Sequence, residues 1–287
     1  MGLFKKKEKK QPEPQWYMSA TNSPTYNYKV YYMKPIEKIL YFLLAFAVGA
    51  AVGYLFYGGI GKDEFGEPTM LTHILDVVIS CGVGLIAGKE FIPVRTKQII
   101  NKRQRLLKMQ FRDMLESLTT SLGAGKNVSD SFKSIYDDLK IQYEEDAFIL
   151  KELEVIISGM ANNVDVEDIL EDFGRRSGIG DIESFANVFR ICYRKGGNIK
   201  DTVRNTHAIL SDKMEIAEDI ETVVTGAKNE QNIMVVMPII LIGMIKLMSS
   251  DFAANFTTVT GILSTTVAIV LFVAAYFIGK IVLDIKV

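Results

Sequence analysis

Residues 121–132, SLGAGKNVSDSF, have the composition of a loop that holds phosphate, with two glycines, Lys126 and several hydroxyl side chains. A phosphate-binding loop of the Walker type requires G-x-x-x-x-G-K-[ST] directly after a strand. Here Thr120 stands at the position of the first glycine and Asn127 at that of the last hydroxyl residue. The preceding segment has the spacing of an amphipathic helix. The sequence therefore favours a corner between two helices over a nucleotide site.

A second segment supports the corner. GKNVSDSF at 125–132 is echoed by GGNIKDTV at 196–203. In both copies an asparagine is placed to cap a helix, and an aspartate lies three residues later, near the exposed amides of the first turn. The glycine before it lets the preceding helix end in a left-handed conformation. We expect two structural corners, made by Gly123, Gly125, Asn127 and Asp130 in the first copy and by Gly196, Gly197, Asn198 and Asp201 in the second.

Two acidic runs follow the first corner. DVEDILEDFGRR contains Glu167, Asp168, Glu171 and Asp172, and YEEDAF contains Glu144, Glu145 and Asp146. Carboxylates four residues apart on a helix are a conceivable divalent-metal site. However, acids at a helix start and the two arginines at its end also match the helix dipole, which favours a solvated face. We expect no metal and no cofactor, and we hypothesise that both runs contact a basic protein surface.

Other residues that could do chemistry stand alone. His207 is a conceivable phosphoacceptor, but an ordinary, partly exposed histidine is favoured because no nucleotide-binding domain follows. Cys81 and Cys192 supply neither a disulfide framework nor metal spacing. Asp76 and Lys246 interrupt two apolar segments, and an isolated charge there costs at least ~2.5 kcal/mol, so we expect an intramembrane pair. The open alternative is that Lys246 extends to the interface and Asp76 faces a wet cavity.

The elements that position these residues are membrane spans and helices. No charged residue occurs between Ile39 and Gly61 or between Phe252 and Gly279. Both stretches exceed the about 20 residues that cross a bilayer core of ~30 Å. Two further apolar segments each contain one charge. We expect spans at 36–61, 71–92, 231–250 and 259–281.

Loop charges predict the orientation. The N-terminal run KKKEKK and the segment RTKQIINKRQR after the second span are basic, whereas the short loops on the other side are acidic. Basic flanks stay in the cytoplasm, so both termini and the region between spans two and three are expected to be cytoplasmic. Residues 1–35, rich in Pro, Gln, Asn and Tyr, are interpreted as a poorly ordered basic tail. Its tyrosines, Tyr26, Tyr28, Tyr31 and Tyr32, are placed at the membrane surface.

The region 93–230 is expected to be helical throughout. Apolar residues recur with a period of 3.6 in about six stretches, and the breaks between them fall at glycines or polar clusters. Residues 106–232 hold 15 basic and 24 acidic residues, a net charge of −9, which makes the region a poor nucleic-acid binder. We therefore predict an all-α protein: four transmembrane helices and a cytoplasmic six-helix bundle built from two three-helix units.

At its corners this region resembles a known family. FRDMLESLTTSLGAGKNVSDSF, GMANNVDVEDILEDFGRRSG and FANVFRICYRKGGNIKDTVRNTHAIL are similar to the F-domain platform proteins of type II secretion, type IV pilus and Tad pilus machines. The resemblance covers about residues 106–230 and the two spans on each side. Lys126 and Asn127 depart from the small and hydroxyl residues usual after the first turn. The arrangement looks most like the single-F-domain Tad members.

The resemblance implies a non-enzymatic platform in the cytoplasmic membrane. It would contact a hexameric secretion ATPase, act on pilin or pseudopilin subunits, and assemble with itself or with a second F-domain protein. Two other classes stay open: a membrane-bound signalling adaptor, suggested by His207 on a membrane-proximal helix, and a small transporter, suggested by Asp76 and Lys246. A sensor needs a larger outer domain than loops of about ten residues provide. Four spans without an internal repeat are few for a transporter.

Overall fold

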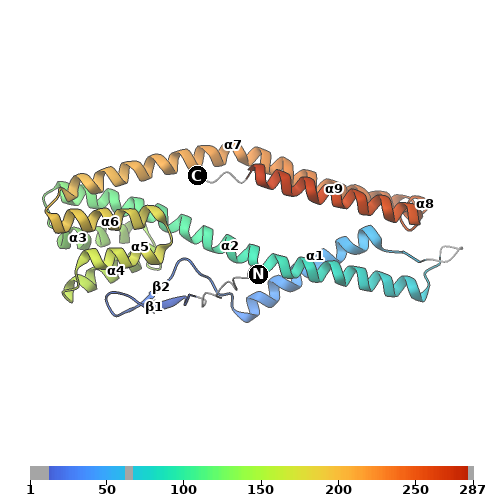
Figure 1. Cartoon of the computed structure of the whole chain (residues 1–287), viewed down its shortest axis with the longest axis horizontal. Helices are drawn as coiled ribbons and strands as arrows, with labels where there is room; N and C mark the ends of the chain where they lie inside the picture. Colours follow the sequence, from blue (N-terminus) through green and yellow to red (C-terminus); the bar gives the residue numbers. More distant parts are fainter. Residues whose placement is uncertain (1–12, 62–66, 284–287) are drawn as a thin grey trace, which may run out of the picture. The chain divides into compact units, whose positions relative to one another are not determined.

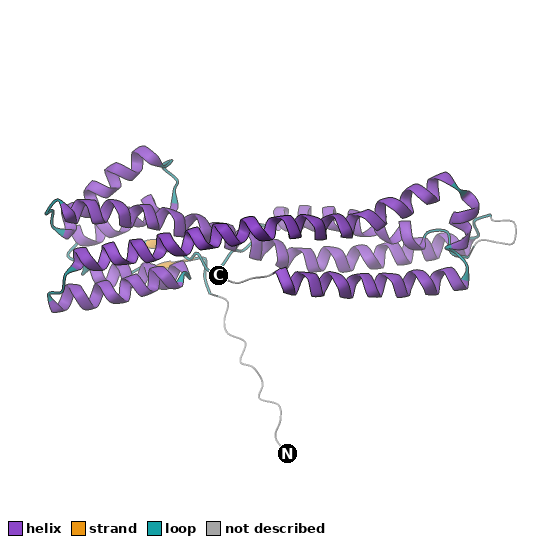
Figure 2. Ribbon diagram, turned by 90° about the horizontal axis from the view of Figure 1, so that it is seen from above, coloured by secondary structure: helices purple, strands orange, loops and turns teal. Residues whose placement is uncertain are grey.

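The computed structural model describes residues 13–61 and 67–283, and the prediction of an all-α protein is confirmed (Figure 2). The helices in the described ranges are α1 (Pro35–Tyr57), α2 (Met70–Gly123), α3 (Val128–Gln142), α4 (Phe148–Ala161), α5 (Val166–Ser177), α6 (Gly180–Lys195), α7 (Ile199–Met248), α8 (Ser250–Asn255) and α9 (Val259–Leu283). A small antiparallel pair, β1 (Trp16–Met18) and β2 (Pro24–Tyr26), precedes them, with Trp16 opposite Tyr26.

The chain forms two compact units. Unit 1 comprises residues 1–32 and 96–212, and unit 2 comprises residues 33–95 and 213–287. The helices α2 and α7 each contribute to both units. The six helices expected over residues 93–230, all of which the structure describes, are the latter part of α2, α3 to α6, and the first part of α7 (Figure 1).

Unit 1 is a helical bundle with a continuous apolar core. The 3.6-residue pattern of the sequence places one face of every helix inside, because residues three and four apart share a face. Phe111 of α2 contacts the rings of Phe173 and Phe185, with centroids 6.1 and 5.4 Å apart. Burial of each such ring contributes about 1.5–3 kcal/mol. The other fully buried core residues include Leu107, Met114, Leu115, Leu118, Phe132, Ile135, Leu153, Ile156, Phe189 and Val203.

Local signals set the helix ends in unit 1. α5 begins with Glu167 and Asp168 in its first turn and ends with Arg175 and Arg176, an order that matches the helix dipole. Gly178 then takes a left-handed conformation with φ of 66°, which stops the helix. The short connection to α6 lets the two helices pack closely.

Unit 2 contains the membrane-length segments. Four helices in the described ranges are long and apolar enough to cross a membrane, namely α1, α2, α7 and α9, and the chain is a multi-pass membrane protein. Their apolar side chains are largely exposed, as expected when the surrounding solvent is lipid. The expected spans differ in detail. α1 ends at Tyr57 rather than at 61, and the helix α8 follows α7, which the sequence did not indicate.

The first two spans pack through small residues. Gly49, Gly53 and Gly84 lie where α1 and α2 approach each other, and a Cβ added at Gly84 would stand 2.9 Å from the carbonyl oxygen of Phe46. Glycine permits this backbone contact because it has no side chain. Gly88 lies against the ring of Phe42, whereas a Cβ at Gly82 would meet no neighbour. Four of these five glycines therefore lie at the contact between α1 and α2.

Candidate functional site

The first corner, between α2 and α3, is closed by its own side chains. Asn127 caps α3: its Oδ1 accepts the backbone N–H of Asp130 at 2.8 Å, and its Nδ2 donates to the Asp130 carboxylate at 2.8 Å. Gly125 has φ of 85°, a left-handed conformation that glycine adopts without strain. Lys126 donates to Ser134 Oγ at 2.6 Å. Lys126, Asn127 and Asp130 are therefore engaged within the corner, whereas the Oγ atoms of Ser121 and Ser131 are buried and have no hydrogen-bond partner among the described residues. The segment in front of them, α2, is a helix rather than a strand.

The second corner, between α6 and α7, has the same construction. The Oδ1 atom of Asn198 accepts the backbone N–H of Asp201 at 3.2 Å, and its Nδ2 donates to the Asp201 carboxylate. Gly196 is the left-handed residue, with φ of 71°, and the N–H of Gly197 donates to the carbonyl of Cys192 at 2.7 Å. The echo in the sequence thus corresponds to two equivalent helix corners. Each corner sets the start of the helix that follows it, α3 or α7.

A cluster of paired charges lies inside unit 1. Arg176 is fully buried and makes a two-pronged ion pair with Glu152 of α4, with N–O distances of 2.7 and 2.6 Å. Its Nε donates to Asp172 at 2.8 Å. Burial lowers the pKa of the Arg176 guanidinium, but the bonds to Glu152 and the charge of Asp172 outweigh it and raise that pKa. We call Arg176, Glu152, Asp172 and Tyr28 the buried cluster.

Tyr28 brings the N-terminal segment into this cluster. Its hydroxyl donates to Glu152 Oε1 at 2.8 Å, and its N–H donates to the carbonyl of Arg176 at 3.0 Å. Burial, followed by the Glu152 charge, raises the pKa of the Tyr28 hydroxyl well above its usual value. Arg176 also donates to the carbonyl of Tyr26 at 3.1 Å. The fourth oxygen that the Arg176 guanidinium binds is therefore a backbone carbonyl of the segment before the first span.

The structure differs here from the expected disordered tail. Residues 13–32 pack on the helical unit: Arg103 of α2 stacks over the rings of Tyr26 and Tyr31, at 4.9 and 4.8 Å from their centroids. Tyr28 is 1% exposed and contacts Phe148, so it does not lie at a membrane surface. Composition suggested disorder, but the tyrosines supply the buried area that orders the segment. The rest of the predicted tail, residues 1–12, lies outside the described residues.

The carboxylates of α5 are mostly engaged within the fold. Glu167 and Asp172 are each 5% exposed. Glu167 accepts from Arg194 of α6 at 3.0 Å, and Arg194 also lies 3.6 Å from Asp168. Glu171 pairs with Arg190 of α6 at 2.5 Å. Of the four candidate contact residues on α5, only Asp168 and Glu171 are accessible to a partner. A shallow hollow of about 340 Å³ separates them from the hairpin residues 18–20.

The acids of the α3–α4 loop are different. Glu144, Glu145 and Asp146 are all exposed. Beside them Ile141, at the end of α3, is 89% exposed. The loop is held against α2, because the hydroxyl of Tyr143 donates to Asp113 of that helix. Burial and that hydrogen bond raise the pKa of Tyr143. Of the two acidic runs predicted to contact a partner, this loop is the one in which all the candidate carboxylates are exposed.

His207 and the two cysteines were the single residues considered for chemistry. His207 lies on α7, and its Nε2 is 3.5 Å from Ser211 Oγ, one turn away. Cys192 contacts the Thr202 hydroxyl at 3.2 Å and, like Cys81, is a free thiol. Within the described ranges 13–61 and 67–283, no group of three or more His, Cys, Asp or Glu side chains is arranged to hold a metal ion.

The two intramembrane charges face one groove. Asp76 of α2 and Lys246 of α7 both line it, but the described partner of Asp76 Oδ1 is the N–H of Gly59, at 2.8 Å. Lys246 Nζ lies 5.0 Å from the centroid of the Phe256 ring. Both residues line one groove, so the cavity of the alternative interpretation is present, and the pairing of Asp76 with Lys246 stays a prediction.

Sequence reasoning missed the buried cluster. The Asp172–Arg176 spacing of four residues on a helix was available, and Glu152 interrupts the apolar stripe of α4. Those two signals together indicate a buried carboxylate and a cation facing each other. Scans of the sequence against protein-family models, curated proteins and solved structures return no match.

Proposed function

We propose that this chain is the platform protein of a type II secretion or a type IV or Tad pilus machine, situated in the cytoplasmic membrane. Unit 1 would face the cytoplasm and bind a hexameric secretion ATPase. Its movements would reach the spans and there help to extract or polymerise pilin subunits. No residue is assigned to bond-making chemistry in this proposal.

One observation carries the proposal. The helical unit is joined to membrane-length segments by two unbroken helices, α2 of 54 residues and α7 of 50 residues. At 1.5 Å per residue each is about 75–80 Å long. A continuous helix transmits a displacement along its axis because its backbone hydrogen bonds resist stretching. A domain that only bound a ligand would have no need of two such connections.

The accessible acids indicate where the ATPase would bind. Since Glu167 and Asp172 are buried in ion pairs, the contact is assigned first to Glu144, Glu145 and Asp146 and second to Asp168 and Glu171. An exposed apolar anchor inside a polar rim is the usual composition of a protein interface. Ile141 supplies such an anchor beside the loop acids.

Photo-crosslinking in native membranes tests the proposal. Probes replace Glu145, Asp168 and Lys200 one at a time, and a matched probe replaces the exposed, lipid-facing Val267 of α9. Mass spectrometry should recover a hexameric secretion ATPase from Glu145 and, more weakly, from Asp168, but not from Val267. Recovery of kinases or response regulators without such an ATPase would move the chain to the signalling class.

Orientation is tested separately. Cys81 and Cys192 are replaced by serine, and single cysteines are placed at Glu145 in the α3–α4 loop and at Thr257 after α8. A membrane-impermeant maleimide added to whole cells should label the Thr257→Cys chain and leave the Glu145→Cys chain unlabelled until the cells are lysed. The reverse pattern would place unit 1 outside and remove the ATPase from consideration.

A further inference from the structure

The groove that contains Asp76 and Lys246 is the largest cavity described in unit 2, with a volume of about 1080 Å³. Its walls come from α1 and α2 on one side and from α7 and α8 on the other. It lies where α1 turns toward α2 and where α7 turns into α8. Polar side chains line it next to apolar ones: besides the two charges, Thr72, His73 and Thr257 border the space.

The two charges line the groove from different helices, Asp76 from α2 and Lys246 from α7. Asp76 is fixed on α2 by the N–H of Gly59, which donates to only one of its oxygens. Lys246 is fixed on α7, with its ammonium group over the Phe256 ring. A negative wall and a positive wall complement a ligand that carries both signs. Its cation would face Asp76 and its anion would face Lys246, because the low dielectric of a membrane strengthens both attractions.

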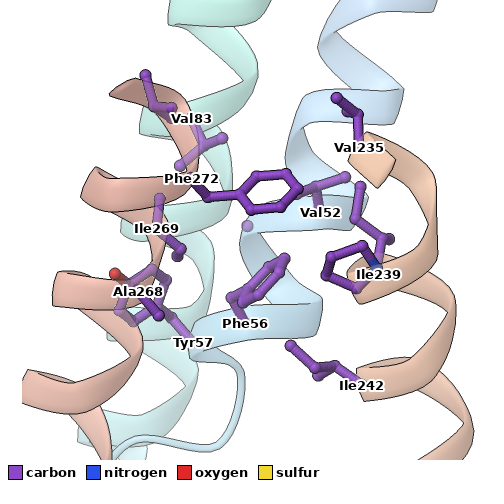
Figure 3. Close-up of a pocket in the computed structure, with 13 residues that line it drawn as sticks. Val52, Phe56, Tyr57, Val83, Val235, Ile239, Ile242, Ala268, Ile269 and Phe272 are labelled. Atoms are coloured by element: carbon purple, nitrogen blue, oxygen red, sulfur yellow. The ribbon is translucent and has the colours of Figure 1, made fainter. Parts of the chain in front are cut away.

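An apolar cavity lies between α1, α2, α7 and α9. It has a volume of about 470 Å³ and is lined by Val52 and Phe56 of α1, Ile239 of α7 and Phe272 of α9, among other apolar residues (Figure 3). The tyrosine in its wall is already satisfied, since the Tyr57 hydroxyl lies 3.0 Å from Thr266 Oγ1. Such a space offers a ligand no hydrogen bond and therefore fits hydrocarbon.

The two spaces follow each other along the helices. On α7, Ile242 lines the apolar cavity and Lys246 lines the groove, four residues later. On α2, Ser80 lines the groove and Val83 lines the apolar cavity, three residues later. Four residues of helix correspond to about 6 Å. The polar groove and the apolar cavity are thus about one helical turn apart. A ligand that fills both has a polar head joined directly to its hydrocarbon tails.

We propose that unit 2 binds a zwitterionic aminophospholipid, with its ammonium at Asp76, its phosphate at Lys246 and acyl chain in the apolar cavity. A primary ammonium fits better than a choline group because it has N–H donors for the carboxylate, whereas a quaternary nitrogen has none. An anionic lipid without an amine would satisfy Lys246 but leave Asp76 opposed by a negative headgroup. The proposal is independent of the secretion-platform function, since it concerns only residues of the spans.

The test uses the full chain in nanodiscs made from equal parts of phosphatidylethanolamine, phosphatidylcholine and phosphatidylglycerol. The protein is released into mild detergent, and native mass spectrometry counts the lipids that stay bound. We expect phosphatidylethanolamine to be enriched at least threefold over each of the others. Lys246→Gln and Asp76→Asn should each abolish the enrichment. The matched changes Lys280→Gln and Glu90→Gln, which remove the same charges outside the groove, should preserve it.

A second pair of variants tests the cavity. Ala268→Phe fills space on its wall and should reduce the retention of all three lipids, whereas Val267→Phe, one residue away on the exposed face, should not. Circular dichroism confirms folding, and Lys246→Arg, which keeps the cation, should restore enrichment where Lys246→Gln has lost it. Equal retention of the three lipids, preference for phosphatidylglycerol, or a copurifying membrane helix in place of lipid would each overturn the proposal.

Discussion

The acids of α5 and those of the α3–α4 loop have similar sequences, EDILED and EED, but different surroundings in the structure. The first run faces Arg175 and Arg176 on its own helix and Arg190 and Arg194 on α6. The second projects from a loop between two helices. Charge density in the sequence therefore says little about which acids can meet a partner. Position relative to the neighbouring helix decides it.

The two acidic runs also differ in what their charges contribute to the stability of the fold. Buried paired charges are sensitive to the loss of one partner, since the other charge then remains in a low dielectric without compensation. Exposed charges contribute little to stability and can be used for recognition. The α5 run should therefore act mainly through folding, and the loop run mainly through binding. Four variants of the chain separate the two roles.

The largest effect is expected from Arg176→Met. The substitution leaves Glu152 buried without its cation and Asp172 with only Arg175, and it should lower the free energy of unfolding by about 3–5 kcal/mol. Urea unfolding of the full chain in detergent, followed by helical circular dichroism, measures it. Arg175→Met on the same turn, whose side chain is 69% exposed, is the control and should change the value by less than about 1 kcal/mol. Equal effects would show that the buried cluster has no special role.

A smaller loss is expected from Tyr28→Phe. It removes the hydroxyl that donates to buried Glu152 and should lower the free energy of unfolding by about 1–3 kcal/mol. The fluorescence of Trp16, which contacts Tyr26 at 5.0 Å between ring centroids, reports whether the N-terminal segment separates first. Tyr32→Phe, at a residue that is 50% exposed, serves as the control and should leave the free energy of unfolding nearly unchanged.

Tyr28 also makes a pH prediction. Its pKa in the folded chain is raised above the usual 10.0, so the folded state keeps the proton when the unfolded state loses it. Stability from this group is complete below pH 10 and decreases as the pH rises above that value. The Tyr28→Phe chain should therefore lose less stability between pH 9 and 11 than the natural chain. A parallel loss in both chains would assign the alkaline sensitivity to other groups, of which Tyr143 is the first to examine.

The third change concerns an accessible ion pair. Glu171 and Arg190 are 47% and 39% exposed in their side chains, so Glu171→Gln should alter the free energy of unfolding by less than about 1 kcal/mol. The difference should shrink further in 0.5 M salt because exposed charges are screened. An effect as large as that of Arg176→Met would mean that this pair is desolvated and belongs with the buried cluster.

The smallest effect on stability is expected in the loop. The triple variant Glu144→Gln, Glu145→Gln and Asp146→Asn should change the free energy of unfolding by no more than about 0.5 kcal/mol, since these side chains are exposed. The same variant should reduce capture of the proposed ATPase and the salt dependence of that capture. Capture at the natural level, with the fold intact, would reject the loop as the contact and leave Asp168 and Glu171 to be tested.

Sequence reasoning was strongest where a signal is local. The helical period of residues 93–230, the caps at Asn127 and Asn198 and the left-handed glycines at 125 and 196 depend on neighbours within a few positions, and the structure contains all of them. The four apolar segments follow from composition and length alone. Helix ends at the membrane loops were less accurate, because Gly58 to Gly61 are as uncharged as the span before them.

The N-terminal segment shows where local signals fail. Its Pro, Asn, Gln and Tyr content is typical of a disordered tail, yet residues 13–32 are ordered by contacts with residues more than 100 positions away. Tyr28 meets Glu152, and Tyr26 meets Arg176, only because α4 and α5 fold into one bundle. The residues of each pair are so far apart in the sequence that no local pattern predicts their contact.

The sequence by itself determined the fold class, the four spans and the two corners, since hydrophobic period, span length and capping act over short distances. The tertiary structure decided the surroundings of each charge. It buried Glu152, Asp172 and Arg176 together, left Glu144 to Asp146 exposed, and set Asp76 and Lys246 on two walls of one groove. The physical reason is that the fate of a charge depends on the groups within a few ångströms of it, and packing alone selects those neighbours.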